Sequence, residues 1–473
     1  MFTKKLETHN IMSPEDEDAI HEATLKVLEQ SGVEVVSDKG REYFAQAGVE
    51  VEDGKVYPSQ KDLEKFLAMA PSEFEMKARN PDNNVTVGGD NTVLVPGYGP
   101  PFVMEYEGER RDSTFEDYKN FTRLAQWSDA LDVVGGVLVE PTDIEDRIRH
   151  GKMMQAGVTL SDKCLMGSAM GAQKASECLD MAAIVFESEK FVEENVVLVS
   201  LINTNSPLQL DERMTDALMV YSENQQAMCI ASLAMTGTTS PTTMPAALVQ
   251  QNAEILTGII LTQIINPGTP VIYGSASSVV DLRGADLALG SPETAKMFNG
   301  TAQMARRYEL PSRGGGALTD SLFPDAQAGY EAMLNVLSGV MGGFNFMLHS
   351  AGLLENYMCM SYEKFIIDSE ICGMVKNYMQ GLEVNEDTLG ADVINEIGPG
   401  GNYISHDHTF QHMKDMRQPE LSSRQKYFSD EEQPEAEKRA HKKCQDILDN
   451  FTPPELPAGI EQELENYIKG LSD

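Results

Sequence analysis

The stretch that decides the fold is residues 195–237, NVVLVSLINTNSPLQLDERMTDALMVYSENQQAMCIASLAMTG. It contains two apolar runs, one starting at residue 195 and the other at residue 227, with a helical segment between them. Each run ends in small or polar residues, as strands do. Continuous apolar runs, without alternation of apolar and polar residues, are typical of strands covered on both faces. The stretch therefore predicts a strand, a helix and a second strand of a parallel sheet.

The same pattern recurs along most of the chain. Apolar runs of this kind start at residues 133, 164, 195, 227, 270, 311 and 344, and successive starts lie 31 to 43 residues apart. This spacing fits one strand, one helix and two short loops. Seven such units in series favour a closed (β/α)₈ barrel of the TIM type over an open α/β sheet. We expect the eighth strand either near residues 92–98 or after Met360.

The two ends of the chain differ from this repeat. Residues 15–30 predict an amphipathic helix, and residues 33–59 predict a helix flanked by short strands. Beyond residue 418 the chain is strongly polar, which suggests two exposed helices joined by prolines. The sequence thus predicts an N-terminal α+β cap over residues 1–90, the barrel over residues 91–418 and a C-terminal helical extension over residues 419–473.

Composition excludes several classes of function. The 473 residues include 37 Lys and Arg against 74 Asp and Glu, a formal net charge of -37, which disfavours nucleic-acid and membrane partners. The six cysteines have no C-x-x-C spacing and are too few for a disulfide scaffold. The longest apolar run, residues 255–265, is too short to span a bilayer. We therefore expect a soluble cytoplasmic protein.

The predicted strand ends indicate where chemistry takes place, because barrel enzymes gather their functional groups there. These ends are rich in small polar residues, such as Asn203, and poor in charge. No pair of lysines or carboxylates suggests a Schiff base or glycoside hydrolysis. His349 is the sharpest candidate, because a lone imidazole after the run FNFML would face the mouth of the barrel.

Other candidates have weaker signals. Residues 95–102, VPGYGPPF, form a stiff loop that displays Tyr98 and Phe102, two rings suited to a bound cation. Arg283 follows the fifth run and is a candidate carboxylate clamp, or else a surface ion pair. The segment HDHTFQH contains His406, His408 and His412, of which the last two share one helical face. Without a Cys or carboxylate at a supporting spacing, a metal-free role for these histidines is favoured.

Four long segments carry a family resemblance, and they are, in order, NTNSPLQLDERM (203–214), LPSRGGGALTDSLFPDAQAGYEA (310–332), HSAGLLENYMCMSYEKFIIDSEI (349–371) and GPGGNYISHDHT (398–409). With these segments the chain resembles the trimethylamine methyltransferase family of corrinoid-dependent enzymes. It implies an α/β barrel enzyme that moves a methyl group from a methylated amine to Co(I) on a separate corrinoid protein.

One departure from the family pattern bears on the substrate. Founding members of the family carry pyrrolysine, which would fall near Leu322 or Phe323, where this chain has ordinary residues. The chain thus resembles the non-pyrrolysine branch, whose members use glycine betaine, proline betaine or carnitine. A quaternary ammonium already bears the charge that lets a tertiary amine leave in an in-line displacement, so placement and exclusion of water are the main requirements.

The resemblance assigns expected roles to individual residues. Tyr98, Phe102 and Tyr357 would hold the ammonium group, while His349 or Arg283 would take the substrate carboxylate. Asn203 would contact the substrate, and His349 is the candidate catalytic residue. No Asp-x-His-x-x-Gly motif is present, so cobalamin is expected on a partner protein, toward which His408 and its segment would form part of the rim. The chain itself is expected to bind no metal.

Two alternatives stay open at this stage. A betaine-binding or sensing protein without catalysis needs only the aromatic cage. A zinc-dependent methyltransferase or hydrolase would use the three histidines of HDHTFQH. Apolar helix faces also make a homo-oligomer reasonable.

Overall fold

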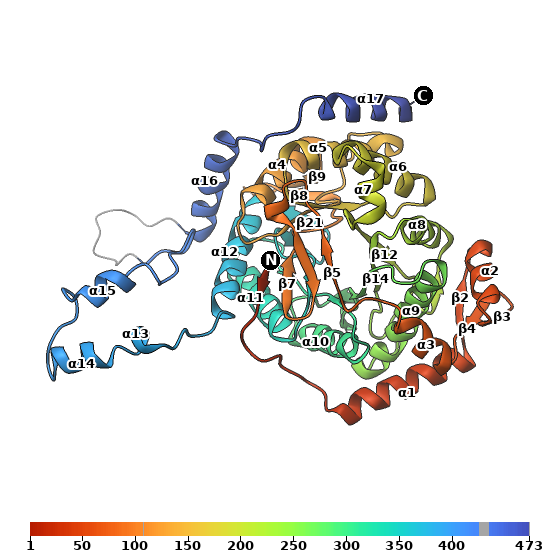
Figure 1. Cartoon of the computed structure of the whole chain (residues 1–473), viewed down its shortest axis with the longest axis horizontal. Helices are drawn as coiled ribbons and strands as arrows, with labels where there is room; N and C mark the ends of the chain where they lie inside the picture. Colours follow the sequence, from red (N-terminus) through yellow and green to blue (C-terminus); the bar gives the residue numbers. More distant parts are fainter. Residues whose placement is uncertain (107, 425–434, 473) are drawn as a thin grey trace.

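A barrel of parallel strands lies at the centre of the computed structural model, which describes residues 1–106, 108–424 and 435–472 (Figure 1). Within these residues eight strands follow one another around it. They are β7 (Asn91–Leu94), β10 (Val133–Gly135), β11 (Cys164–Gly167), β12 (Leu198–Asn203), β14 (Ala227–Ser232), β15 (Val271–Ser275), β18 (Ser312–Arg313) and β19 (Phe346–Met347). Each of the seven predicted runs contains one of these strands, so the βα repeat is confirmed.

The barrel closes between its first and second strands. Strand β19 pairs in parallel with β7, and the backbone N–H of Asp132 donates to the carbonyl of Leu94 across 2.8 Å. The N–H of Leu94 donates in turn to Oδ2 of Asp132, also at 2.8 Å. The missing strand is therefore β7, at the first of the two places that the sequence predicts and not after Met360.

Helices surround the barrel and alternate with its strands. They are α4 (Phe115–Trp127), α5 (Asp146–Leu160), α6 (Ala172–Val185), α7 (Glu189–Glu194), α8 (Glu212–Glu223), α9 (Met244–Ile265), α10 (Pro292–Arg307), α11 (Ala326–Met341) and α12 (Tyr362–Tyr378). Local sequence sets where these helices begin. The side chain of Ser291 caps α10 by accepting from the N–H of Thr294, and that of Asp325 caps α11 by accepting from the N–H of Ala328.

The barrel is filled by apolar side chains and plugged at one end. A hairpin of β5 (Glu73–Met76) and β6 (Val85–Gly88) packs side chains such as Phe74 and Val87 against the interior. This hairpin lies at the amino end of the strands, since it runs directly into β7 and Met76 pairs with Val196, just before β12. The opposite end, where the strands finish, is left for the site.

The N-terminal segment covers one side of the barrel. It contains α1 (Pro14–Gln30), β2 (Val33–Val35), α2 (Asp38–Gln46), β3 (Glu50–Glu52), β4 (Lys55–Tyr57) and α3 (Gln60–Leu67), while β1 (Phe2–Thr3) adds antiparallel to β7. All three helices pack on α9. Helix α9 is therefore buried between cap and barrel, which explains its long apolar run. None of the described helices is long and apolar enough to cross a membrane.

The C-terminal helices correct one expectation from the sequence. The polar pattern predicts two exposed helices, and the two helices are present as α16 (Ala436–Asp449) and α17 (Ile460–Ser472). Both of them pack on the barrel. Helix α16 lies against α12 and α4 and buries Ala440 and Cys444, whereas α17 lies against α5 and α6 and buries Leu464 and Ile468. Their polar residues mark only the outer faces.

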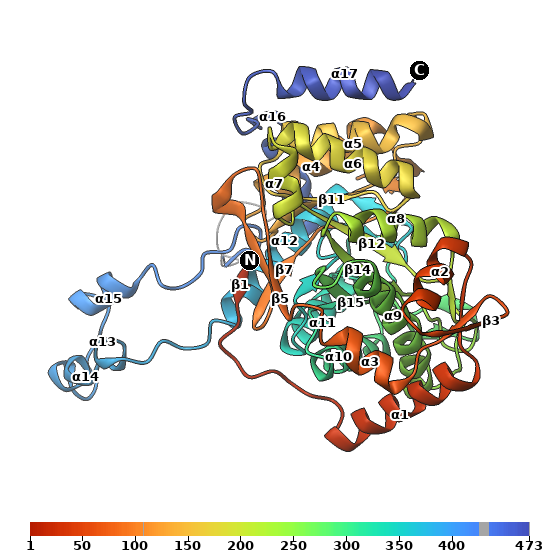
Figure 2. The ribbon, with the colours of Figure 1, turned by 45° about the vertical axis from the view of Figure 1, so that its right-hand side comes forward.

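One segment stands away from the body. Residues 382–418, hereafter the arm, carry the short helices α13 (Glu386–Leu389), α14 (Ala391–Ile397) and α15 (Asp407–His412). Figures 1 and 2 show the arm extending from the side of the barrel, in the pale blue part of the chain. The division at residues 90 and 418 stays a prediction, but the arm, which falls in the predicted barrel range, adds no strand to the barrel.

Candidate active site at the mouth of the barrel

Loops from opposite ends of the sequence are paired beside the barrel mouth. The loop after β7 contains β8 (Phe102–Met104) and β9 (Arg110–Asp112), and the loop after β19 contains β20 (Leu353–Leu354) and β21 (Cys359–Ser361). These four strands form one small sheet in which β8 pairs in parallel with β21. The pairing fixes the loop that carries Tyr98 next to the loop that carries Tyr357.

A buried arginine lies at the carboxyl end of β18. Arg313 is 2% exposed, and its Nη1 donates to the carbonyl of Ser275 at 2.7 Å while its Nη2 lies 3.0 Å from Nε2 of His349. No described Asp or Glu side chain pairs with this guanidinium, and its Nε has no hydrogen-bond partner there. A buried cation without a counter-ion is costly, and an anion bound beside it would lower that cost.

The contact with Arg313 fixes the state of His349. A guanidinium only donates, so Nε2 of His349 accepts and its proton resides on Nδ1, which has no partner among the described residues. Burial, and then the positive charge of Arg313, holds the pKa of His349 well below its ordinary value. The imidazole is therefore neutral near pH 7 and presents one free N–H donor in the site.

The backbone at His349 is held in an unusual conformation. Its φ is +69°, its N–H donates to the carbonyl of Pro96 at 3.1 Å, and its carbonyl accepts from Ala317 at 2.8 Å. The glycine run after Arg313 makes this possible, because a Cβ on Gly316 would lie 2.6 Å from the carbonyl carbon of His349. Strained backbone kept at one position by its surroundings is typical of functional sites.

Two tyrosines complete the group. The ring of Tyr357 lies 4.8 Å from that of His349, tilted by 51°, and burial raises the pKa of Tyr357 to about 12. Tyr98 is half-buried, packs on the barrel interior, and has its pKa raised by burial. Both phenols are thus neutral and offer ring faces. The group has an aromatic surface and a buried cation but no residue poised as an acid or base near pH 7.

A small cavity adjoins this group at the ends of β10, β11 and β12. Its volume is about 150 Å³, and it is lined by Tyr98, Asn203, Leu201, Met153 and Met214 among others. A cavity of about this size accommodates a ligand as large as benzene. In the order of strands, Tyr98 after β7 stands between this cavity and the Arg313–His349 pair at β18 and β19. Charged side chains also line it, namely Glu140, Asp146, Arg149, His150 and Lys174. The mouth therefore offers a small cavity of mixed polarity on one side and a buried cation on the other.

The predicted site residues do not all meet here. His349, Tyr357, Tyr98 and Asn203 lie at the mouth. Phe102 packs in a separate small cluster with Met104 and Leu354, and the Arg110 guanidinium covers its ring at 4.6 Å. The side chain of Arg283 is 91% exposed and pairs with Asp281 at 2.6 Å. Of the two roles that the sequence allows for Arg283, a carboxylate clamp or a surface ion pair, the structure shows the surface ion pair.

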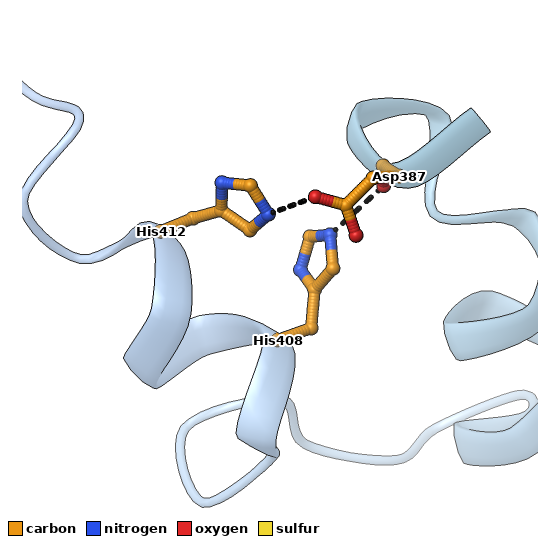
Figure 3. A group of neighbouring side chains, drawn as sticks. All are labelled: Asp387, His408 and His412. Carbon is orange, nitrogen blue, oxygen red and sulfur yellow. Dashed lines mark hydrogen bonds and ion pairs between the residues drawn. The ribbon is translucent and has the colours of Figure 1, made fainter. Parts of the chain in front are cut away.

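His408 lies in the arm and not in this group. Its Nε2 is 3.1 Å from the backbone oxygen of Asp387, and Nε2 of His412 is 3.1 Å from Oδ2 of the same residue (Figure 3). The corrinoid contact expected of His408 stays a prediction.

Sequence reasoning missed Arg313. The residue lies inside the run PSRGGGAL, which the repeat identifies as a strand, and a charged residue within a buried strand is the signal that marks it.

Comparison with known proteins agrees with this picture. The family model "Trimethylamine methyltransferase (MTTB)" matches residues 1–471. The glycine betaine methyltransferase of Desulfitobacterium hafniense (strain Y51) is 46% identical over 98% of this chain and 97% of its own length. The proline betaine:corrinoid methyltransferase of Eubacterium limosum is 29% identical over 99% of both chains.

A solved structure supports the fold. The monomethylamine methyltransferase of Methanosarcina barkeri superposes with a TM-score of 0.56 at 9% identity, covering 98% of this chain and 89% of that one. At this identity the likeness shows the fold alone. The family match, which spans nearly the whole chain, identifies the chain as a member of the trimethylamine methyltransferase family.

Proposed function

We propose that this enzyme transfers a methyl group from a carboxylated quaternary amine, of the glycine betaine type, to a corrinoid carried on a separate protein. One observation carries the choice of substrate: the guanidinium of Arg313 is buried without a counter-ion and bonded to a neutral His349. A substrate carboxylate would supply the missing anion, through charge-assisted hydrogen bonds from the free Nε of Arg313 and the free Nδ1 of His349. Trimethylamine has no such group.

The reaction fits a group of Arg313, His349, Tyr357 and Tyr98 that contains no acid or base titrating near pH 7. The reduced corrinoid of the partner would supply the nucleophile. The methyl carbon would bond to that nucleophile as its bond to nitrogen breaks, the electron pair of the broken bond would stay on nitrogen, and a neutral tertiary amine would leave, so no proton has to move. The residues of this chain bind the zwitterion, direct one methyl group outward and exclude water. The neutral rings of Tyr98 and Tyr357 would face the ammonium group.

The rim of the mouth suits a protein partner. Six large apolar side chains are 37–57% exposed in loops at the carboxyl ends of the strands: Met170, Leu233, Leu282, Leu322, Phe323 and Met358. Exposed apolar residues gathered around an opening are typical of an interaction surface. Leu322 and Phe323, near the position expected for pyrrolysine, belong to this rim. We infer that the corrinoid protein docks there and brings cobalamin to the mouth.

The reducing environment that this chemistry needs agrees with a cytoplasmic location. All six cysteines are free and buried, and none is placed for a disulfide.

A panel of methyl donors tests the function. Purified enzyme, a corrinoid protein and reduced cobalamin are mixed with glycine betaine, proline betaine, carnitine, choline or trimethylamine, and methylcobalamin is followed by absorbance. We expect a carboxylated donor to react best. A preference for choline or trimethylamine would overturn the assignment. Tight betaine binding in calorimetry without methyl transfer would support a binding protein instead.

Replacing His349 by alanine should weaken substrate binding without unfolding the barrel. Loss of one hydrogen bond to a charged group costs about 1.5–3 kcal/mol, which corresponds to about a 10- to 150-fold rise in KM for a betaine. Because no proton passes through His349, kcat should change less than KM. Steady-state kinetics on the preferred betaine measure both, and an unchanged KM would exclude the role.

Replacing Tyr98 by alanine should raise KM by about 2- to 30-fold, because one cation–π contact contributes about 0.5–2 kcal/mol. Tyr98→Phe keeps the ring face and should retain most of the affinity. Phe102→Ala is the matched comparison: its ring is already covered by Arg110, so we expect little change in KM. A large effect of Phe102→Ala with none of Tyr98→Ala would place the ammonium elsewhere.

A further inference from the structure

The arm lacks a core of its own. It leaves the body after α12 and returns where Arg417 bonds to Glu370, with nitrogen–oxygen distances of 3.2 and 2.9 Å. Its helices have four, seven and six residues, and none of their side chains is buried. Helices this short are not stable in water by themselves. Another source of order is therefore required within the arm.

A cluster of ligand-type side chains joins two of these helices. His408 and His412 stand one turn apart on α15, and Asp387 reaches them from α13 (Figure 3). One ligand atom from each of the three residues lies within 4.8 Å of the others. The two imidazole rings are 4.3 Å apart between centroids, and Nε2 of His412 lies 3.1 Å from Oδ2 of Asp387.

The other nitrogen of His412 is held as in metal sites. Its Nδ1 lies 2.6 Å from Oδ2 of Asp415, one turn further along the chain. Histidines that bind metals almost always use their second nitrogen in this way, which fixes the ring and turns the ligating nitrogen toward the ion. Here Nε2 of His412 faces the Asp387 carboxylate, on the side where His408 also points (Figure 3).

We propose that Asp387, His408 and His412 bind a divalent transition-metal ion, zinc in the first place, that fastens α15 to α13. Two imidazoles and one carboxylate are a ligand set that zinc accepts, with water in the fourth position. Ligand atoms around tetrahedral zinc are about 3.3 Å apart at bonds of about 2.0 Å. The ligand atoms of this cluster, which lie within 4.8 Å of one another, therefore need to approach by at most about 1.5 Å. Such an ion stabilises a small module that has no apolar core.

Zinc titration tests this site directly. Full-length protein is freed of metal with a chelator, and zinc chloride is added in a calorimeter. We expect one zinc per chain at micromolar affinity or tighter, and slower proteolysis of the arm once zinc is bound. His412→Ala and Asp387→Asn should each weaken binding at least tenfold. His9→Ala, an exposed histidine outside the arm, should bind zinc as the wild type does.

Two results would overturn the site: wild-type protein that takes up less than about one-tenth of a zinc per chain, or a His412→Ala variant with undiminished affinity. Because the arm lies outside the barrel, all variants should keep the wild-type melting temperature of the body, which excludes misfolding as the cause.

A second observation is independent of the metal. The arm exposes nine large apolar side chains, from 41% to 92%: Leu382, Val384, Leu389, Ile394, Tyr403, Ile404, Phe410, Met413 and Met416. The adjoining outer face of α11 and α12 exposes four more, Tyr330, Leu334, Met374 and Tyr378. Large apolar side chains exposed in such number on one part of a protein are typical of interaction sites. Both surfaces belong to the same chain, and the arm begins where α12 ends.

We infer that the arm of one copy covers the α11–α12 face of a second copy, and that the exchange is reciprocal. A two-fold interface needs a surface and its complement on every subunit, and this chain has both. At roughly 70 Å² for each of the nine arm side chains, and a similar area on the receiving face, two such contacts bury about 2,500 Å². Obligate homodimers bury about 2,000–5,000 Å². The corrinoid protein is expected at the mouth and not at this flank.

Light scattering after gel filtration tests the exchange. Wild-type enzyme should be dimeric or larger, and the arm variant Ile404→Glu/Phe410→Glu and the face variant Tyr330→Glu/Tyr378→Glu should both be monomeric. An equimolar mixture of the two variants retains one intact contact and should form heterodimers. Leu282→Glu, an exposed leucine on the mouth rim, should leave the assembly unchanged.

A monomeric wild type, or arm variants that assemble normally, would overturn the inference. Arm variants that lose only the corrinoid protein would assign the arm to that partner instead.

Discussion

Replacing Arg313 by methionine should lower kcat/KM for glycine betaine by about 100- to 200-fold. The variant removes the hydrogen bond from Nε of Arg313 to the carboxylate together with the positive charge, a loss of about 3 kcal/mol, and each 1.4 kcal/mol is a factor of ten. The fold should tolerate the change, because methionine fills a similar space and no carboxylate is left without a partner. Kinetics of methyl transfer, with circular dichroism to check the fold, measure the effect.

Two comparisons separate substrate binding from general damage. The rate with choline, which has the ammonium but no carboxylate, should fall far less, so the preference for betaine over choline should collapse in Arg313→Met. Arg283→Met should keep the wild-type rate within about twofold, because that side chain is in solvent and paired with Asp281. The opposite result, an inactive Arg283→Met and an active Arg313→Met, would show that Arg283 binds the substrate carboxylate, as the sequence suggests.

The contrast between these two arginines shows what local sequence can and cannot predict. Apolar runs at regular spacing predict the strands well, because a strand buried on both faces needs apolar side chains at nearly every position. Whether one side chain in a run reaches the site depends on barrel closure. Arg313 becomes a site residue only because β19 places His349 beside it. Arg283 follows a strand as well, but a β-hairpin of β16 (Val280–Asp281) and β17 (Asp286–Leu287) carries it outward.

The histidine segment illustrates the same limit. Spacing alone places His408 and His412 on one helical face, and the structure agrees. The carboxylate that completes the cluster comes from Asp387, which is 21 residues before His408 on another helix, so no motif reveals it. Likewise, a polar pattern predicts the two C-terminal helices but not the apolar stripes by which they pack on the barrel.

Replacing Lys364 by methionine should destabilise the enzyme by about 3–5 kcal/mol. Lys364 and Asp368 form an ion pair at 2.5 Å on α12, and both side chains are fully buried. Removing only the lysine leaves a buried carboxylate without its partner. The pair also holds the loops around His349, since Lys364 donates to the carbonyl of Ala317 at 3.1 Å and Asp368 accepts from the N–H of Gly352 at 2.8 Å. KM for the betaine should therefore rise as well. Urea unfolding measures the loss.

The double variant Lys364→Met/Asp368→Asn is the control, because it removes both charges and keeps an acceptor for Gly352. It should regain more than half of the lost stability, whereas equal losses in both variants would mean that packing and not charge is responsible.

The pH dependence of stability gives a second check. Burial raises the pKa of Asp368 from 3.8 to about 6, although Lys364 opposes the rise. The folded state thus binds this proton more tightly than the unfolded state, so ionisation of Asp368 lowers stability as pH increases from about 4 through 6. Without Lys364 the pKa rises further, and the deficit of Lys364→Met against wild type should be larger at pH 8 than at pH 5.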